Sequence, residues 1–193
     1  KLYEKWEKHL QLVSVSVSEE YLNTKFFKEF DGGALIINSK FLPNKELVEA
    51  ISELKPSEML TFNGKWIAIK SDVGFNKKSW EGVTPKIFKG EVKTIENWWD
   101  LYKVNGVEIE NDFDLITKGR ISQPLSSTNT LIGSVDRIFI EKGAYVEACT
   151  LNTQIGSIYI GNSVEVMEGC SIRGGFSVLD DSKIKLGSKI YGP

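Results

Sequence analysis

The sequence predicts a layered α/β domain followed by a left-handed parallel β-helix of hexapeptide repeats. Three observations lead to this fold class: Ile and Val recur with a period of six in the last third of the chain, strand and helix patterns are mixed in the first part, and a polar stretch separates the two. Mixed strands and helices are typical of layered α/β domains. We place the α/β domain at residues 1–119, the linker at 120–133 and the β-helix at 134–193.

The period of six is the most regular pattern in the chain. The residues at its consecutive repeat positions are Ile160, Val166, Ile172, Val178, Ile184 and Ile190. A helix repeats about every 3.6 residues and a strand about every 2, whereas in a hexapeptide β-helix each repeat forms one short strand and three strands close a triangular coil. β-branched residues suit stacked strands. We therefore expect the repeat positions to point into the coil; the alternative is chance spacing in a β-sandwich.

An earlier piece of the same pattern occurs at Ile140 and Val146. The phase then slips by two residues before Ile160. This slip predicts one irregular coil with residues 151–156 in a loop, because insertions in repeat proteins usually fall on loops.

The first part of the chain carries helix and strand signals in turn. Asn63-Gly64 lies between two short apolar runs and predicts a β-hairpin with a type I′ turn. Asn105-Gly106 is expected to interrupt the last helical pattern. The expected elements are helices at residues 1–11, after Ser18, at 44–54, at 98–102 and at 107–117, and strands at 12–17, 34–38, 59–62, 65–70 and 87–95.

The composition indicates a globular protein without a strongly charged partner. Apolar residues make up 41% of the chain and charged residues 26%, and the net charge is −2. This balance gives no electrostatic basis for binding nucleic acid or an anionic membrane, and no apolar run is long enough to cross a bilayer. We find no signal peptide pattern and expect Cys149 and Cys170 to be buried reduced thiols, so the expected location is cytoplasmic.

Two features indicate a piece of a longer protein. The sequence begins at Lys1 within a helical pattern, and it ends at Pro193 with the period of six still in phase. Because about three repeating units are needed for a stable stack, we expect the repeat array to continue beyond Pro193.

Common catalytic motifs are absent from the sequence. We find no Walker loop, no G-x-G-x-x-G fingerprint, no zinc spacing and no nucleophile elbow. The single histidine, His9, lies in the first helical pattern and is expected on the helix surface. Local motifs therefore identify no candidate site residues.

The order of the two domains and three sequence stretches carry a resemblance to a known family. The stretches are Glu4–Glu7, Ala34–Ile51, and Asn97–Asp100 together with the run Gly119–Gly133, in which Arg120–Ser126 with Asn129 and Gly133 is distinctive. On these residues the chain resembles the sugar-phosphate nucleotidyltransferases, especially the bifunctional N-acetylglucosamine-phosphate uridylyltransferase type and its relatives without an established substrate. The resemblance implies a nucleotide and a sugar phosphate as ligands, a homotrimer formed through the β-helix, and a glycine-rich nucleotide loop that would precede Lys1.

The resemblance also implies site residues and a metal cofactor. Members of the family usually carry Asn-Gly-Asp after the strand at 34–38, and that Asp binds Mg²⁺; this chain has Asn38-Ser39-Lys40. A lysine offers no lone pair to a metal at neutral pH, so we expect Lys40 to contact a phosphate as a point charge and Asn38 to contact sugar or ribose hydroxyls. Trp99-Asp100 matches the pair that holds the other metal ligand. Asp100 is therefore the expected catalytic residue and Mg²⁺ ligand; the alternative is a solvated helix carboxylate.

Three functions follow from these expectations. The first is a sugar-phosphate nucleotidyltransferase with a degenerate metal site, which joins a nucleoside triphosphate to a sugar phosphate and releases pyrophosphate. The second is a non-catalytic sugar-nucleotide-binding or assembly protein of the same fold. The third is a hexapeptide-repeat acyltransferase, which is least favoured because such enzymes generally need a histidine near the coils and none follows His9. The sequence selects neither the nucleotide nor the sugar.

Overall fold

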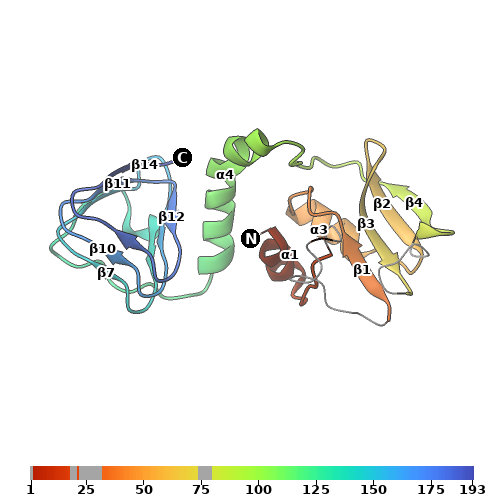
Figure 1. The fold of residues 1–193 in the computed structure, drawn as a ribbon, viewed down its shortest axis with the longest axis horizontal. Helices are drawn as coiled ribbons and strands as arrows, with labels where there is room; N and C mark the ends of the chain where they lie inside the picture. The colour runs from red at the N-terminus through yellow and green to blue at the C-terminus, as the bar shows by residue number, and fades with distance from the viewer. Residues whose placement is uncertain (1, 18–20, 22–31, 74–79) are drawn as a thin grey trace. The chain divides into compact units, whose positions relative to one another are not determined.

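The structure of the chain, a computed structural model, describes residues 2–17, 21, 32–73 and 80–193. The chain divides into two compact units, Lys1–Trp98 and Trp99–Pro193, which we call the α/β unit and the solenoid unit (Figure 1). The helix predicted after Ser18 lies outside the described residues except at Tyr21.

A four-stranded sheet with the order β1-β3-β2-β4 organises the α/β unit. Its strands are β1 (Ala34–Ile37), β2 (Glu58–Phe62), β3 (Lys65–Ser71) and β4 (Thr84–Ile87). β3 pairs antiparallel with β1 and β2, and β2 pairs parallel with β4. Asn63 and Gly64 join β2 to β3 with φ values of 50° and 76°, the left-handed conformation that a type I′ turn requires. The predicted hairpin is confirmed.

Two helices share an apolar core with this sheet. They are α1 (Leu2–Leu10) and α3 (Lys45–Ser52). Trp6 of α1 and Leu47 and Ile51 of α3 are all buried in the same cluster as residues of the sheet. Asn44 caps α3, because its Oδ1 accepts a hydrogen bond from the Leu47 N–H at 2.8 Å. The core thus holds the sheet and both helices in a fixed arrangement.

Two strands predicted in the α/β unit differ from the structure. Residues 12–17 form no strand, although Val and Ser alternate there; Val13 is exposed, and Ser14 donates hydrogen bonds from its N–H and its Oγ to a glutamate of α1. The strand predicted at 87–95 is displaced, because β4 ends where that range begins. β4 contains Pro85, which disfavours a strand in the sequence. The structure accepts this proline because β4 lies at the edge of the sheet.

The last helix of the first part is continuous. α4 runs from Trp98 to Thr117, so the predicted break at Asn105-Gly106 is wrong. A glycine inside a helix costs only about 1 kcal/mol, and packing can offset that cost. A Cβ on Gly106 would lie 2.6 Å from Cγ of Pro193, so the glycine lets the last residue of the chain approach the helix.

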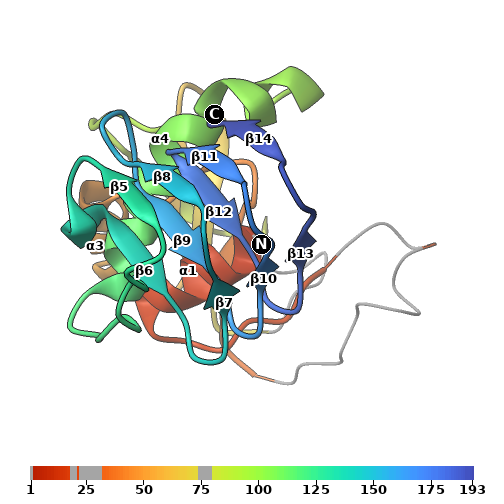
Figure 2. The same ribbon diagram turned by 90° about the vertical axis from the view of Figure 1, so that its left-hand side faces the viewer.

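Short parallel strands build the solenoid unit as three sheets (Figure 2). The sheets contain β7 (Tyr145–Val146), β10 (Glu165–Val166) and β13 (Lys183–Ile184); β5 (Thr130–Ile132), β8 (Thr150–Asn152), β11 (Ser171–Arg173) and β14 (Lys189–Tyr191); and β6 (Ile138–Ile140), β9 (Ile158–Ile160) and β12 (Phe176–Val178). A 3₁₀ turn, η2 (Val135–Arg137), leads into β6. Successive coils each add a strand to every sheet, with all pairs parallel. The predicted parallel β-helix is confirmed.

The repeat positions point into the coils as predicted. Val166 pairs with Val146 on one side and Ile184 on the other, and no part of it is exposed. Leu151 occupies an interior row with Ile172 and is also fully buried. The predicted pattern contains only Ile and Val at its repeat positions, so it puts this leucine in a loop. The loop begins only after β8, and the phase slip lies there.

The stretch predicted as a linker, residues 120–133, is built into the solenoid unit. Its last residues form β5, which pairs with β8. The Gln123 N–H donates to the carbonyl oxygen of Ile140 at 2.8 Å, and the Asn129 side-chain amide donates to that of Val146 at 2.8 Å. The polar composition of this stretch therefore serves hydrogen bonds to the first coils.

Helix α4 packs on the sheet of β6, β9 and β12 through an aromatic cluster. Phe113 of α4 is buried with Phe139 and Tyr159, whose rings stack with centroids 6.0 Å apart. Beside these rings the buried carboxylate of Glu141 accepts hydrogen bonds from Tyr159 Oη and from Arg120 Nη2, each at 2.7 Å. The Arg120 guanidinium also lies 5.0 Å from the centre of the Phe139 ring.

A second polar cluster holds the middle of α4. Glu110 Oε1 accepts a hydrogen bond from the Ser157 N–H at 2.7 Å, and Glu110 Oε2 accepts one from Ser157 Oγ at 2.8 Å. The guanidinium of Arg137 pairs with the same carboxylate and, at 3.4 Å, with Asp114. Helix α4 is therefore an integral part of the solenoid unit, so the units divide near residue 98 and not at the predicted boundary after residue 119.

Two further expectations concern membrane spans and the cysteines. Among the helices of the described residues, none is long and apolar enough to cross a membrane. Cys149 and Cys170 are both free and buried, as predicted. Burial raises the pKa of the Cys149 thiol, which keeps this cysteine in its unreactive form.

Candidate functional site

A hollow of about 500 Å³ opens in the α/β unit where β1 ends and β3 begins. Its lining residues are Asn38, Lys40, Phe41, Gly64, Lys65, Trp66 and Glu96. Two of the three predicted site residues, Asn38 and Lys40, therefore lie in one hollow. This volume lies within the range of small-molecule sites in proteins.

Asn38 shapes the turn that forms one wall of the hollow. Its backbone N–H donates to the Ile67 carbonyl oxygen at 2.8 Å, which continues the pairing of β1 with β3 for one residue. Its side-chain amide donates to the Trp66 carbonyl oxygen at 3.1 Å, and its Oδ1 accepts from the Lys40 N–H at 3.1 Å. Asn38 thus has a structural role that accounts for both ends of its amide.

The segment after β4 forms another side of the hollow. Phe41 and Thr94 form an isolated antiparallel bridge, and the Ile95 N–H donates to the Lys40 carbonyl oxygen at 2.8 Å. This pairing brings Glu96, the next residue, beside Lys40. Residues far apart in the sequence are therefore held together by backbone hydrogen bonds.

Two lysines share one carboxylate in the hollow. Lys65 Nζ lies 2.7 Å from Glu96 Oε1, and Lys40 Nζ lies 3.8 Å from Glu96 Oε2. The lysine side chains are 57% and 58% exposed, and that of Glu96 is 32% exposed. Such open ion pairs contribute little to folding stability. The three side chains together leave one positive charge in excess, which favours an anionic ligand.

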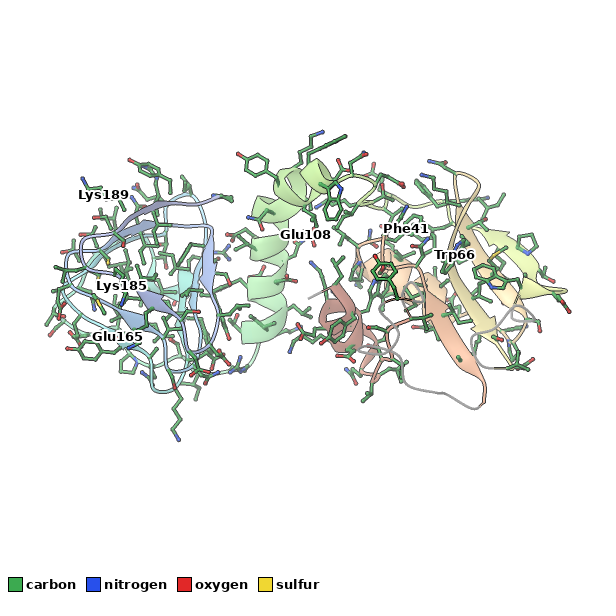
Figure 3. All side chains as sticks on the ribbon, viewed as in Figure 1. Phe41, Trp66, Glu108, Glu165, Lys185 and Lys189 are labelled. Atoms are coloured by element: carbon green, nitrogen blue, oxygen red, sulfur yellow. The ribbon has the colours of Figure 1, made fainter. Side chains whose placement is uncertain are left out.

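Two aromatic residues, Phe41 and Trp66, are among the lining residues of the hollow. The half-buried Trp66 packs edge-to-face against Trp80, with ring centroids 4.8 Å apart and an angle of 84° between the rings. Figure 3 labels Trp66 and the buried Phe41 in this unit. A flat aromatic side chain beside ammonium groups is suited to a ligand that carries both a ring and a phosphate.

Asp100, the third predicted site residue, belongs to the solenoid unit. It lies in the first turn of α4, where an acidic side chain interacts favourably with the helix dipole. Its assignment as catalytic residue and metal ligand stays a prediction.

Mg²⁺ stays a predicted cofactor, and the described residues supply one carboxylate to the hollow, that of Glu96. None of their His, Cys, Asp and Glu side chains gather in groups of three or more that could hold a metal ion. Mg²⁺ is usually held by one or two carboxylates together with substrate phosphates. The resemblance described above implies that Lys40 takes the place of a metal-binding carboxylate, and an ammonium group cannot bind a metal.

Sequence reasoning missed Lys65, Trp66 and Glu96. The first two follow the Asn63-Gly64 turn directly, and the predicted hairpin pairs them with the last residues of β2. This signal could have been used. Glu96 gave no comparable signal, because its position depends on the bridge between Phe41 and Thr94.

Comparison with known proteins defines the class of protein to which this arrangement belongs. A family model described as sugar nucleotidyl transferase matches residues 1–121, which is more than half of the 193-residue chain. The chain therefore belongs to the sugar nucleotidyl transferase family. The match supports the family in general and does not select the uridylyltransferase type. A search of curated proteins found no match.

Proposed function

We propose that the hollow of the α/β unit binds the phosphates of a nucleotide or nucleotide sugar. The family match over residues 1–121 carries this proposal, and the excess positive charge at Lys40 and Lys65 supports it. In the reaction of such a transferase, an oxygen of the sugar phosphate attacks the α-phosphorus of a nucleoside triphosphate. A new phosphorus–oxygen bond forms, the bond to the β-phosphate breaks, and pyrophosphate leaves.

The lysines would act by neutralising charge on the phosphates. Each ammonium can donate hydrogen bonds to phosphate oxygens as a point charge, and the Trp66 ring can pack against the base or the sugar. Positioning and charge neutralisation are the main sources of catalysis in phosphoryl-type transfers. No contact of Asn38 with a ligand is needed for these roles.

We further propose that transfer is weak or absent with common substrates. The observation behind this proposal is Lys40, which supplies a flexible positive charge in place of a metal-binding carboxylate. The same observation favours the second candidate, a binding protein that has kept the fold without efficient catalysis. The homotrimer and the cytoplasmic location inferred above stay predictions.

Calorimetric titration of the full-length protein with nucleoside triphosphates, with and without Mg²⁺, tests the binding site. Lys40→Ala should weaken binding by about 1 kcal/mol, the lower part of the range for a charge-assisted contact, because the side chain is more exposed than buried. Lys86→Ala is the control, since Lys86 is 45% exposed and also pairs with a carboxylate of this unit, that of the more buried Glu58 at 2.7 Å, but lies outside the hollow.

Two results would contradict these proposals. Equal affinities of Lys40→Ala and the unchanged protein would remove Lys40 from the site. Rapid release of pyrophosphate with an ordinary nucleoside triphosphate and sugar phosphate would overturn the proposal of weak transfer while leaving the binding site intact.

A further inference from the structure

We propose that Glu96 is an internal competitor for phosphate: its carboxylate holds Lys40 and Lys65, and a nucleoside di- or triphosphate binds by displacing it. This inference rests on the proposed function and adds the groups that limit affinity and the class of ligand. In the absence of a ligand, the carboxylate of Glu96 would thus occupy the phosphate position in the hollow.

One of the two lysine contacts of Glu96 has the length of a contact to a bound phosphate. Lys65 Nζ is 2.7 Å from one carboxylate oxygen, and Lys40 Nζ is 3.8 Å from the other. Charge-assisted contacts between an ammonium group and a phosphate oxygen have the same length as the shorter of these distances. The carboxylate therefore occupies the place between the lysines that a phosphate oxygen would take.

Exposure makes the exchange feasible. The two lysine side chains are more than half exposed, and about a third of the Glu96 side chain is exposed. Ion pairs in such surroundings are weak because water screens both charges. A phosphate carries more negative charge and more acceptor oxygens than a carboxylate, so it can replace Glu96 as the partner of both lysines.

The shape of the hollow determines the class of ligand. Its volume of about 500 Å³ is larger than one phosphate group requires, and two aromatic residues, Phe41 and Trp66, are among its lining residues. Aromatic rings stack with nucleobases. A ligand with a base and a chain of phosphates uses both the ring and the lysines, whereas inorganic pyrophosphate uses the lysines alone.

The test is calorimetric titration of the full chain with inorganic pyrophosphate and with each common nucleoside triphosphate. Glu96→Gln keeps the size of the side chain and removes its charge, so we expect affinity for these ligands to rise about five- to tenfold. Lys65→Met should lower affinity. In the double variant the gain from Glu96→Gln should shrink, because its closest lysine is gone.

The solenoid unit supplies a matched control. Glu165 pairs with Lys183 at 2.8 Å, with side chains 36% and 60% exposed, values close to those of Glu96 and Lys65. Glu165→Gln changes the net charge of the protein by the same amount, and Figure 3 places Glu165 on the solenoid. This variant should leave affinity unchanged, which separates local competition from a general effect of charge.

Each outcome decides between the two proposals. Equal affinities of Glu96→Gln and Glu165→Gln, together with weaker binding by Lys65→Met, would overturn the competitor role and keep the binding site. Absence of binding by the unchanged protein and by every variant would overturn the proposed function as well. Should Glu96→Gln fail to fold, Glu96→Asp, which withdraws the carboxylate from Lys65, must give a smaller rise in affinity for the inference to stand.

Discussion

The two units contain ion pairs of the same length that have different consequences. Arg120 and Glu141 in the solenoid unit and Lys65 and Glu96 in the α/β unit each approach to 2.7 Å. The Glu141 side chain is only 8% exposed and also accepts a hydrogen bond from a tyrosine, whereas Glu96 is 32% exposed. The Arg120 side chain is 46% exposed, but its removal would leave the buried Glu141 carboxylate without a charged partner, which is costly, while an open pair can exchange its partner. Burial, and not distance, separates the structural pair from the one available to a ligand.

The largest expected effect concerns the apolar interior that makes the solenoid rigid. Val166→Asp places a charge at a position with no exposed surface, between Val146 and Ile184, and should cost about 3–5 kcal/mol. Thermal unfolding followed by circular dichroism measures this loss. Leu186→Asp, at an exposed position of the same unit, is the control and should change stability little. Similar melting of both variants would break the comparison, because it would put Val166 outside the interior.

The next effect concerns the polar anchor of α4. Glu110→Ala leaves the Ser157 N–H and hydroxyl and the Arg137 guanidinium without their shared acceptor, so we expect a loss of about 2–3 kcal/mol and faster hydrogen exchange along α4. Asp114→Ala serves as the control, because Asp114 contacts the same arginine from a position that is 70% exposed. If both variants exchange at the same rate, the anchor is no stronger than a surface pair.

The smallest effect is a dependence on alkaline pH. Burial, followed by the hydrogen bond to Glu141, raises the pKa of Tyr159 from its usual 10.0 to about 12. Because the folded-state pKa is the higher one, this contribution to stability is complete below pH 10 and is lost as the pH rises towards 12. Tyr159→Phe should lose about 1 kcal/mol at neutral pH and should lack this alkaline decline.

Denaturant unfolding at a series of alkaline pH values, with tyrosinate absorbance as a second signal, checks this prediction. The difference in unfolding free energy between the unchanged protein and Tyr159→Phe should shrink as the pH rises through this window. A difference that stays constant would show that the Tyr159 hydroxyl is not protected in the folded state.

The solenoid was predictable from the sequence because each coil repeats the same requirement. A residue at a repeat position meets its own kind in the coils above and below, so the pattern in Ile and Val carries the fold. Leu151 was not predicted as an interior residue because it fills the same kind of interior position with a side chain that is neither Ile nor Val. The continuous helix α4 was not predicted, because Asn-Gly usually marks a turn. The space beside Gly106 is taken by Pro193, a residue that no local pattern connects with it.

The candidate site was predictable only in part. Asn38 and Lys40 directly follow a strand and are only two residues apart, so the sequence alone places them close together. Glu96 reaches them through pairing between Phe41 and Thr94, which depends on the folded chain. The charge balance of the hollow, which determines how strongly it attracts phosphate, therefore could not be read before the structure was known.

Helix α4 belongs by sequence to the transferase match and by packing to the solenoid. The match extends to residue 121, yet Glu110 and Phe113 contact strands that lie beyond it. A gene fusion made at the end of the match would separate the helix from these partners, whereas one made near residue 98 would keep them together. The helix and the β-helix therefore form one packing unit, although the end of the family match separates them.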